Sequence, residues 1–473
     1  MRRSARAFIV VCALSGCAVG PDYLRPDAAV SDAYKEATGW KVAEPHDESN
    51  RGNWWEIFGD SQLSALIESI NISNQNVHLA EAQFRQAQAL AAQSRAALFP
   101  TLDANASITR SRSPTGLVGG TTAGRIINNR SVALSSSWEL DLWGGLRRAL
   151  ESSEAGAQAS AADLAAARLS AQAELASDYF QLRILDAQKQ LLEDTVAGYQ
   201  KSLDLTKNRY DAGVAAKVDL VQAETQLKST RAQAIDTEVQ RAQLEHAIAV
   251  LIGKAPAQFA IAPVPLVVTM PRVPVGLPSE LLERRPDVAA AERRAAGANA
   301  RIGVAKAAYF PSLTLSGNTG FRSAAATGLF TAPSRFWSIG PALAQSIFDA
   351  GLRRAQTEQA IAAYDATVAQ YRQAVLAGFQ EVEDNLAALR ILGEEAEVQE
   401  EAVRAARESV SLTTNQYKAG IVSYINVVTV QTTQLGNERT AMGILGRRLV
   451  AAVTLVKALG GGWSAAEIAA DNR

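Results

Sequence analysis

Alternating apolar and polar residues single out four short segments of the chain. In residues 131–145, SVALSSSWELDLWGG, most apolar side chains fall at every second position, with Ser, Glu or Asp between them. Residues 101–109, 312–316 and 337–347 alternate in a similar way, although Pro341 removes a backbone donor from the last segment. The pattern predicts four β-strands, each with one apolar and one polar face.

A seven-residue apolar repeat predicts long helices in the rest of the chain. The repeat has a single break in the first half, at Lys189, and no proline interrupts residues 115–255 or any position after Pro341. Its members are Leu175, Leu182, Val196, Leu203 and Tyr210, and then Val382, Leu389, Ala396, Val403, Val410 and Tyr417. We therefore expect coiled-coil packing between long helices.

The chain is internally duplicated. RYDAG ends at Gly213 and QYKAG ends at Gly420, an offset of 420 − 213 = 207 residues, and ALFPTL and GLRR also recur as AYFPSL and GLRR in the same order. Each copy should contain a helix, two strands, a long helix, a glycine turn and a shorter helix. The expected segments are a leader (1–16), an N-terminal arm (17–62), a first repeat (63–253, strands at about 100–142), a Pro-rich linker (254–280), a second repeat (281–460, strands at about 310–348) and a tail (461–473).

The N-terminus has the pattern of an export signal. Three arginines lie within the first six residues, a short apolar run follows, and Leu14-Ser15-Gly16-Cys17 resembles the bacterial lipobox. Cleavage would leave Cys17 as the first residue, carrying diacylglycerol on its sulfur and an acyl chain such as palmitate on its nitrogen. Cys12 would be removed with the leader, so the mature chain could form no internal disulfide. Ala18 after the lipidated residue favours the outer membrane.

Composition argues against several classes of function. The net charge of −1 over 473 residues gives no basic surface for nucleic acid. The three histidines, His46, His78 and His246, are scattered without ligand or triad spacing, and the Gly-rich stretches lack the context of a phosphate loop. We therefore expect no enzyme activity and no metal site.

The four strands pose a closure problem if they cross a membrane. A spanning strand needs roughly 9 to 11 residues, and lipid cannot satisfy the hydrogen bonds of an open sheet edge. The smallest bacterial barrels use about eight strands, so the missing partners would come from other copies of the chain. Two copies would supply eight strands, and three would supply twelve around a more open lumen. The alternatives are the edge of a soluble sandwich and a coiled-coil rod.

Motifs along nearly the whole chain resemble the TolC-like outer-membrane efflux proteins, in the OprM and NodT lipoprotein branch. The matching stretches are LSGCAVGPDYLRP, WWEIFGD, LDLWGGLRR, LLERRPDVAAAE, AYFPSL and FDAGLRR. The resemblance implies a membrane α+β fold: a trimer whose twelve outer-membrane strands form a β-barrel continuous with a long periplasmic α-helical barrel. The N-terminal arm, the linker and the tail would form an equatorial belt.

The resemblance also implies a function and partners. The trimer would be the exit duct of a tripartite efflux system, taking small molecules such as drugs from a periplasmic adaptor (membrane fusion protein) and an inner-membrane pump across the outer membrane. Conduction would be passive and would need no cofactor, because the pump supplies the energy. A conduit for type I-like protein secretion is the main alternative, and a structural coiled-coil lipoprotein is a weaker one.

The expected functional residues lie at the two glycine turns. By resemblance, Gly213 and Gly420 are the periplasmic hairpin tips, where an adaptor would make contact, and glycine there also ends a helix. Asp219 matches a family position at the pore constriction, where threefold symmetry would make a ring of carboxylates. A solvated helix residue is the alternative for Asp219.

The second tip departs from the family pattern. Thr429 and Thr432 occupy positions where the OprM-like motif carries Asp and Arg, whereas Ile425, beside Tyr424, matches the apolar gating position. We therefore expect a constriction held by apolar packing at Ile425 rather than by a charged latch.

Overall fold

The computed structural model describes residues 18–28, 33–36, 53–112, 126–264, 270–271 and 284–463. They belong to two compact units, here called the sheet unit (Met1–Asp27, Phe84–Ser160 and Ala291–Tyr371) and the hairpin unit (Ala28–Gln83, Ala161–Ala290 and Arg372–Arg473). Four of the five unit boundaries fall inside helices: α3 (Gln75–Ala96), α4 (Gly145–Asp211), α7 (Pro286–Ala307) and α8 (Leu352–Lys418). None of the described helices is long and apolar enough to cross a membrane.

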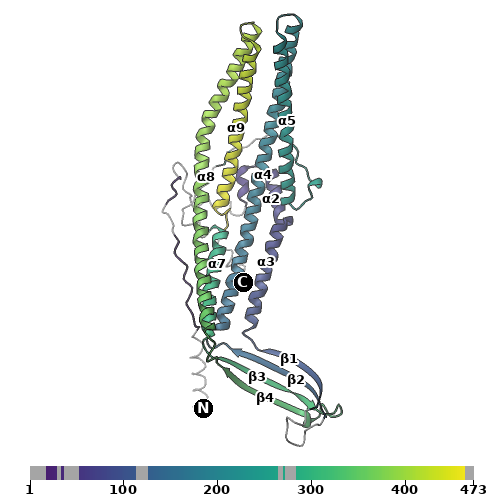
Figure 1. Ribbon diagram of the computed structural model, residues 1–473, viewed down its shortest axis with the longest axis vertical. Coiled ribbons are helices and arrows are strands. Elements are labelled where there is room, and N and C mark those ends of the chain that lie inside the picture. The colour runs from purple at the N-terminus through teal and green to yellow at the C-terminus, as the bar shows by residue number, and fades with distance from the viewer. Residues whose placement is uncertain are drawn as a thin grey trace. The chain divides into compact units, whose positions relative to one another are not determined.

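The sheet unit contains one antiparallel sheet in the order β1-β2-β3-β4 (Figure 1). Its strands are β1 (Thr101–Arg112), β2 (Ile126–Leu140), β3 (Ser312–Ser323) and β4 (Arg335–Ala344), and a short 3-10 helix, η5 (Ala332–Ser334), precedes β4. The four predicted strands are thus confirmed, but two end earlier than expected. Leu142 and Ile347 lie beyond β2 and β4, because the chain turns at Asp141 and Asp349 to start the following helices.

The strand register collects the apolar residues on one face of the sheet. Leu134 lies opposite Ala104 on one side and Thr319 on the other, and Trp138 lies opposite Leu315. The other face is polar and is joined across β1 and β2, where Asn105 donates to Ser135 at 2.9 Å and the Ser107 and Ser131 hydroxyls lie 2.8 Å apart. The apolar face is open within one chain: Leu102 and Trp337 are 72% and 69% exposed.

Both outer edges of the sheet, along β1 and β4, lack a neighbouring strand among the described residues. Pro341 lies within β4, opposite Leu315. Proline has no backbone N–H, so β4 can donate no ladder hydrogen bond at this position.

The hairpin unit contains the two helical hairpins α4–α5 and α8–α9, with α5 at Lys217–Leu251 and α9 at Tyr424–Ala458 (Figure 1). The lengths match between copies: 67 residues for α4 and α8, 35 for α5 and α9, and 22 for α3 and α7. The predicted heptad positions Leu175, Leu182 and Val382 are fully buried. At the predicted break α4 continues, since the Lys189 ammonium projects to Glu238 on α5 at 2.7 Å.

Two short elements that precede α4 in the chain pack on it, η2 (Trp54–Phe58) and α2 (Ser61–Ser73). A third short element, η3 (Pro256–Gln258), follows α5. The Asp60 carboxylate caps α2 by accepting the backbone N–H groups of Gln62 and Leu63, and it also accepts the Tyr179 hydroxyl of α4 at 2.7 Å. Phe58 lies against Phe180 with ring centroids 4.8 Å apart.

Candidate functional site

The two hairpin tips have the same backbone geometry. Gly213 and Gly420 adopt φ of 74° and 77°, a left-handed conformation that glycine reaches without strain. The residue after each glycine donates its backbone N–H to the carbonyl five residues earlier in the chain. Val214 donates to the Arg209 carbonyl at 2.8 Å, and Ile421 donates to the Gln416 carbonyl at 2.9 Å. This Schellman pattern satisfies carbonyls at the ends of α4 and α8 and turns the chain into α5 and α9.

Tyr424 is the packing centre of the tip region. Its ring is 1% exposed and lies in a cluster with Tyr417, Ala223 and Val427, with the Tyr417 ring edge-on at 5.3 Å. Burial raises the pKa of the Tyr424 phenol to about 12, and the Asp219 carboxylate adds to this rise. The phenol is therefore neutral at physiological pH.

Three hydrogen bonds and one cation–π contact join the first hairpin to the second near the tips. The Arg209 guanidinium lies over the Tyr417 ring at 4.9 Å and donates to the Lys418 carbonyl, the last residue of α8, at 3.1 Å. Further up, Gln226 donates to the Thr432 hydroxyl at 3.1 Å. The Tyr417 hydroxyl reaches Thr206 on α4 at 3.5 Å. Sequence reasoning missed Arg209, because nothing along the chain links it to a carbonyl 209 residues away.

The structure brings some of the predicted constriction residues together. Asp219 lies in the first turn of α5, close enough to Tyr424 to affect its ionisation. Ile425 is 47% exposed, so within one chain the apolar packing at this tip is made by Tyr424. Thr429 is exposed and its hydroxyl donates to the Ile425 carbonyl at 2.9 Å, which leaves a neutral surface on this part of α9.

The LDLWGGLRR and FDAGLRR motifs form the helix starts of the two long helices. The Asp141 carboxylate accepts the backbone N–H groups of Leu146 and Arg147, and Asp349 accepts those of Gly351 and Arg353. Each aspartate also accepts from the side chain of the arginine in its own motif. The motif therefore fixes the point where each strand pair passes into its long helix.

Ala18 and Val19, which follow the predicted lipobox, pack on this junction in the sheet unit. Val19 donates its N–H to the Trp143 carbonyl at 2.9 Å, and a Cβ on Gly144 would lie 2.8 Å from the Ala18 Cα. The Trp143 ring stacks on Phe310 at 4.7 Å. Cys17 itself lies outside the described residues.

The arginine of the LLERRPDVAAAE motif ties three helices of the hairpin unit together. Arg285 donates to Asp287 at 2.6 Å, to Glu381 of α8 at 2.7 Å and to the Ala458 carbonyl at the end of α9 at 3.2 Å. These carboxylates raise the pKa of Arg285 against the opposing effect of burial. Sequence reasoning noted this motif for its resemblance but missed its structural role.

The histidines form no site in the part of the chain described. His78 is half exposed beside Glu81, at 3.3 Å, and His246 is exposed on α5. His46 lies outside the described residues. Across the described ranges, no group of three His, Cys, Asp or Glu side chains could hold a metal ion.

Comparison with known sequences identifies relatives over nearly the whole chain. The family model "Outer membrane efflux protein" matches residues 66–254 and 277–461. The chain is 31% identical over 454 residues to the probable efflux pump outer membrane protein TtgC of Pseudomonas putida, covering 95% of this chain and 93% of TtgC. It is also 31% identical to the pyoverdine export outer membrane protein OpmQ of Pseudomonas aeruginosa, covering 97% of this chain and 96% of OpmQ.

Solved structures with the same fold are outer-membrane channels. OprN superposes with a TM-score of 0.89 at 31% identity, over 94% of this chain and all of OprN. The open state of MtrE of Neisseria gonorrhoeae superposes with a TM-score of 0.83 at 29% identity, over 94% of this chain and 98% of MtrE. The chain thus belongs to the outer membrane efflux protein family, and it is an outer-membrane channel of an efflux system rather than an enzyme.

Proposed function

We propose that three copies of the chain together close one barrel in the outer membrane. The observation that carries this proposal is the open four-stranded sheet, which has two unpaired edges and an exposed apolar face. In lipid an unpaired edge is costly, so β1 of one copy would pair with β4 of the next, giving twelve strands. The Ser, Thr and Asn face would line water, and the Leu, Ile and Trp face would meet lipid.

The helical hairpins would continue this barrel into the periplasm as a helical duct. Their tips, at Gly213 and Gly420, would meet a periplasmic adaptor coupled to an inner-membrane pump. Relatives named for efflux of antibiotics or toluene and for export of pyoverdine support small molecules as the cargo. Conduction would be passive, and selectivity would reside largely in the pump.

The narrowest part of the duct would lie at the tips. Threefold symmetry would repeat Asp219 as a carboxylate ring, and Ile425 would meet its copies as an apolar ring. The exposure of Ile425 in a single chain supports this role, because its side chain is free to pack between copies. Thr429 would give the pore a neutral polar lining below this ring.

We expect Cys17 to carry the lipid anchor. Ala18 and Val19 are held against Gly144 and Trp143 at the end of β2, where the strands pass into helix. An acyl group on the preceding residue would then enter the membrane beside the barrel.

The N-terminal arm, the linker and the tail would form the equatorial belt around the helices. Support comes from Arg183 of α4, which donates to the Ala262 carbonyl of the linker at 2.9 Å and to Gln62 at the start of α2. On α8, Arg390 pairs with Glu36 of the arm at 2.8 Å. Both repeats thus anchor these segments through an arginine at equivalent positions, 390 − 183 = 207 residues apart.

Deletion of the gene tests the cargo, and conductance tests the constriction. Cells that lack the gene should retain a fluorescent efflux dye, and the wild-type gene should restore efflux of the dye. A missing secreted protein with normal dye efflux would instead indicate a protein-export conduit. In planar bilayers Ile425→Ala should raise the conductance and the leakage of antibiotics, and unchanged values would refute the proposed apolar ring.

A further inference from the structure

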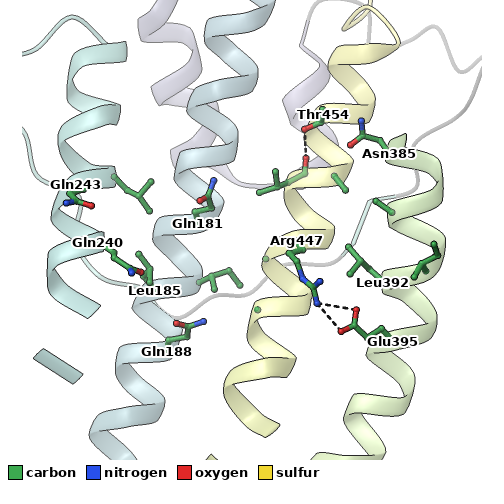
Figure 2. Close-up of a pocket in the computed structure, with 18 residues that line it drawn as sticks. Gln181, Leu185, Gln188, Gln240, Gln243, Asn385, Leu392, Glu395, Arg447 and Thr454 are labelled. Atoms are coloured by element: carbon green, nitrogen blue, oxygen red, sulfur yellow. Dashed lines mark hydrogen bonds and ion pairs between the residues drawn. The ribbon is translucent and has the colours of Figure 1, made fainter. Parts of the chain in front are cut away.

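A large groove runs between the two hairpins, away from the tips. Its cavity volume is about 1070 Å³, and all four hairpin helices contribute to its wall (Figure 2). Its floor is apolar and includes Ile184, Leu392 and Ala451, each less than 9% exposed. A cavity of this size could hold a drug-sized molecule.

The groove lies on the face of α4 opposite to the equatorial segments. Gln181, Leu185 and Gln188 line the groove, and they share one face of the helix at i, i+4 and i+7. Arg183 and Asp186 lie about half a turn away, where Arg183 binds the linker carbonyl and Gln62. In a duct whose belt is on the outside, the groove would therefore face the lumen.

Four neutral glutamine amides of the groove are free to bind. Figure 2 shows Gln181 and Gln188 on α4 and Gln240 and Gln243 on α5, on one side of the groove. None of these four glutamine side chains makes a hydrogen bond within the described ranges of the chain. Each amide offers both a donor and an acceptor.

The charges in the groove neutralise each other. On the side opposite the glutamines, Arg447 of α9 donates to both oxygens of Glu395 on α8, at 3.0 and 3.1 Å (Figure 2). The groove therefore combines an apolar floor, free amides and no net charge, which does not favour an ion of either sign.

We propose that this groove binds uncharged amphipathic molecules, which place an aromatic or aliphatic body on the apolar floor and a hydrogen-bonding group on the glutamine amides. The site would hold cargo transiently on its way through the duct. The inference rests on the proposed trimeric duct, because a lumenal groove meets cargo only if the assembled chains form one.

The test uses the full lipidated chain in lipid nanodiscs and the uncharged fluorescent amine N-phenyl-1-naphthylamine, with the signal of empty nanodiscs subtracted. Ala388→Phe fills the groove from α8, and Ala405→Phe places the same ring on an exposed part of α8 away from the groove. We expect saturable binding that Ala388→Phe weakens about tenfold and Ala405→Phe leaves unchanged.

A second variant removes the amides and keeps the volume. Gln240→Leu with Gln243→Leu should weaken binding of the amine about threefold or more, whereas Gln416→Leu, at an exposed position of α8, should not. Equal affinity in wild type, Ala388→Phe and the double leucine variant would overturn the inference.

Conductance of the same samples separates the two proposals. Groove variants that lose binding but still conduct would support a cargo site in a working duct. If the wild-type chain binds the amine at this groove but forms no conducting pore, the proposed trimeric duct fails while the binding site stands.

Discussion

In the two repeats, the second hairpin helices, α5 and α9, end with the same backbone geometry. The side chain that binds the last carbonyl of the helix differs between them. Gly253 follows α5 with φ of 68°, and Gly460 follows α9 with φ of 94°. A Cβ on Gly253 would lie 2.1 Å from the Ser73 carbonyl oxygen, and a Cβ on Gly460 would lie 2.0 Å from that of Arg284. The two junctions are therefore structural copies.

The donor at each helix end differs. In the first repeat Asn74 donates through Nδ2 to the Leu251 carbonyl at 2.7 Å, and in the second Arg285 donates to Ala458 at 3.2 Å. Leu251 and Ala458 are the last residues of α5 and α9. A helix end needs a donor for its free carbonyls but does not prescribe which side chain supplies it. The second repeat adds two carboxylates to its donor, which makes this junction a charge network.

The glycines should be the most sensitive positions, and equally so in both repeats. Gly253→Ala and Gly460→Ala should each cost more than about 3 kcal/mol of unfolding free energy, because the left-handed backbone strains a Cβ and a carbonyl oxygen occupies its place. Urea unfolding in detergent, followed by helical circular dichroism, measures this loss. Gly393→Ala in α8, where a Cβ meets nothing within 4 Å, is the control and should be neutral or slightly stabilising. A large difference between the two junctions would break their equivalence.

Arg285→Ala should have the next largest effect. The substitution leaves Glu381 and Asp287 without their cation and the Ala458 carbonyl without this donor, at a cost of roughly 3 kcal/mol. This value is at the low end for buried pairs because the carboxylates are nearly half exposed. The same unfolding assay applies, with exposed Arg404→Ala as control. Equal stability of the two variants would show that the network does not hold the junction.

Asn74→Ala should cost less than Arg285→Ala, roughly 1 to 2 kcal/mol, because it removes a neutral donor from Leu251 and the cap at the start of α3 but leaves no buried charge. The ratio of the two losses measures how much more the charged donor stabilises its junction than the neutral one does. A larger loss of unfolding free energy for Asn74→Ala than for Arg285→Ala would mean that helix capping, and not charge pairing, is the main source of stability at both junctions.

Alkaline pH should destabilise the second tip through Tyr424. Its counterpart in the first tip, 424 − 207 = 217, is the exposed Lys217. Because the folded pKa of Tyr424 is raised from 10.0 to about 12, the folded state holds the proton more tightly. The contribution of Tyr424 to the free energy of unfolding should therefore be constant below pH 10 and fall between pH 10 and 12. The difference in unfolding free energy between wild type and Tyr424→Phe isolates this group, and a difference independent of pH would contradict its burial.

Converting the groove's ion pair into amides should change stability least. Glu395 and Arg447 correspond to Gln188 and Gln240 of the first repeat, 207 residues earlier. Both charged side chains are substantially exposed, so the double variant Glu395→Gln, Arg447→Gln should change the free energy of unfolding by less than about 1 kcal/mol. The double variant makes the second repeat resemble the first, and a larger loss would mean that this pair is structural.

Sequence patterns predicted the elements well because the signals are local. Period-two alternation found all four strands, and the heptad positions include the fully buried Leu175 and Val382. The glycine turns followed from the recurrence of RYDAG and QYKAG. The predicted strand ends are less accurate, because the alternation continues past Leu140 and Ala344 toward the turns in which Asp141 and Asp349 cap the next helices.

The contacts that join distant segments could not be read from the sequence. Asn74 meets a carbonyl 177 residues away, and Arg285 meets one 173 residues away. At the tip, the family resemblance pointed to Ile425 with Tyr424 beside it, but it could not show that Tyr424 packs on Tyr417 or that Arg209 lies over the Tyr417 ring. These long-range contacts depend on which helix faces come together, and packing over the whole fold decides that.

The most direct test of the account is the mass of the mature, lipidated chain in detergent, measured by native mass spectrometry with bound detergent removed. We expect a species of three chains, which supplies twelve strands and leaves no sheet edge unpaired. A stable, folded monomer would leave the edges of β1 and β4 open in the membrane and would contradict the shared barrel.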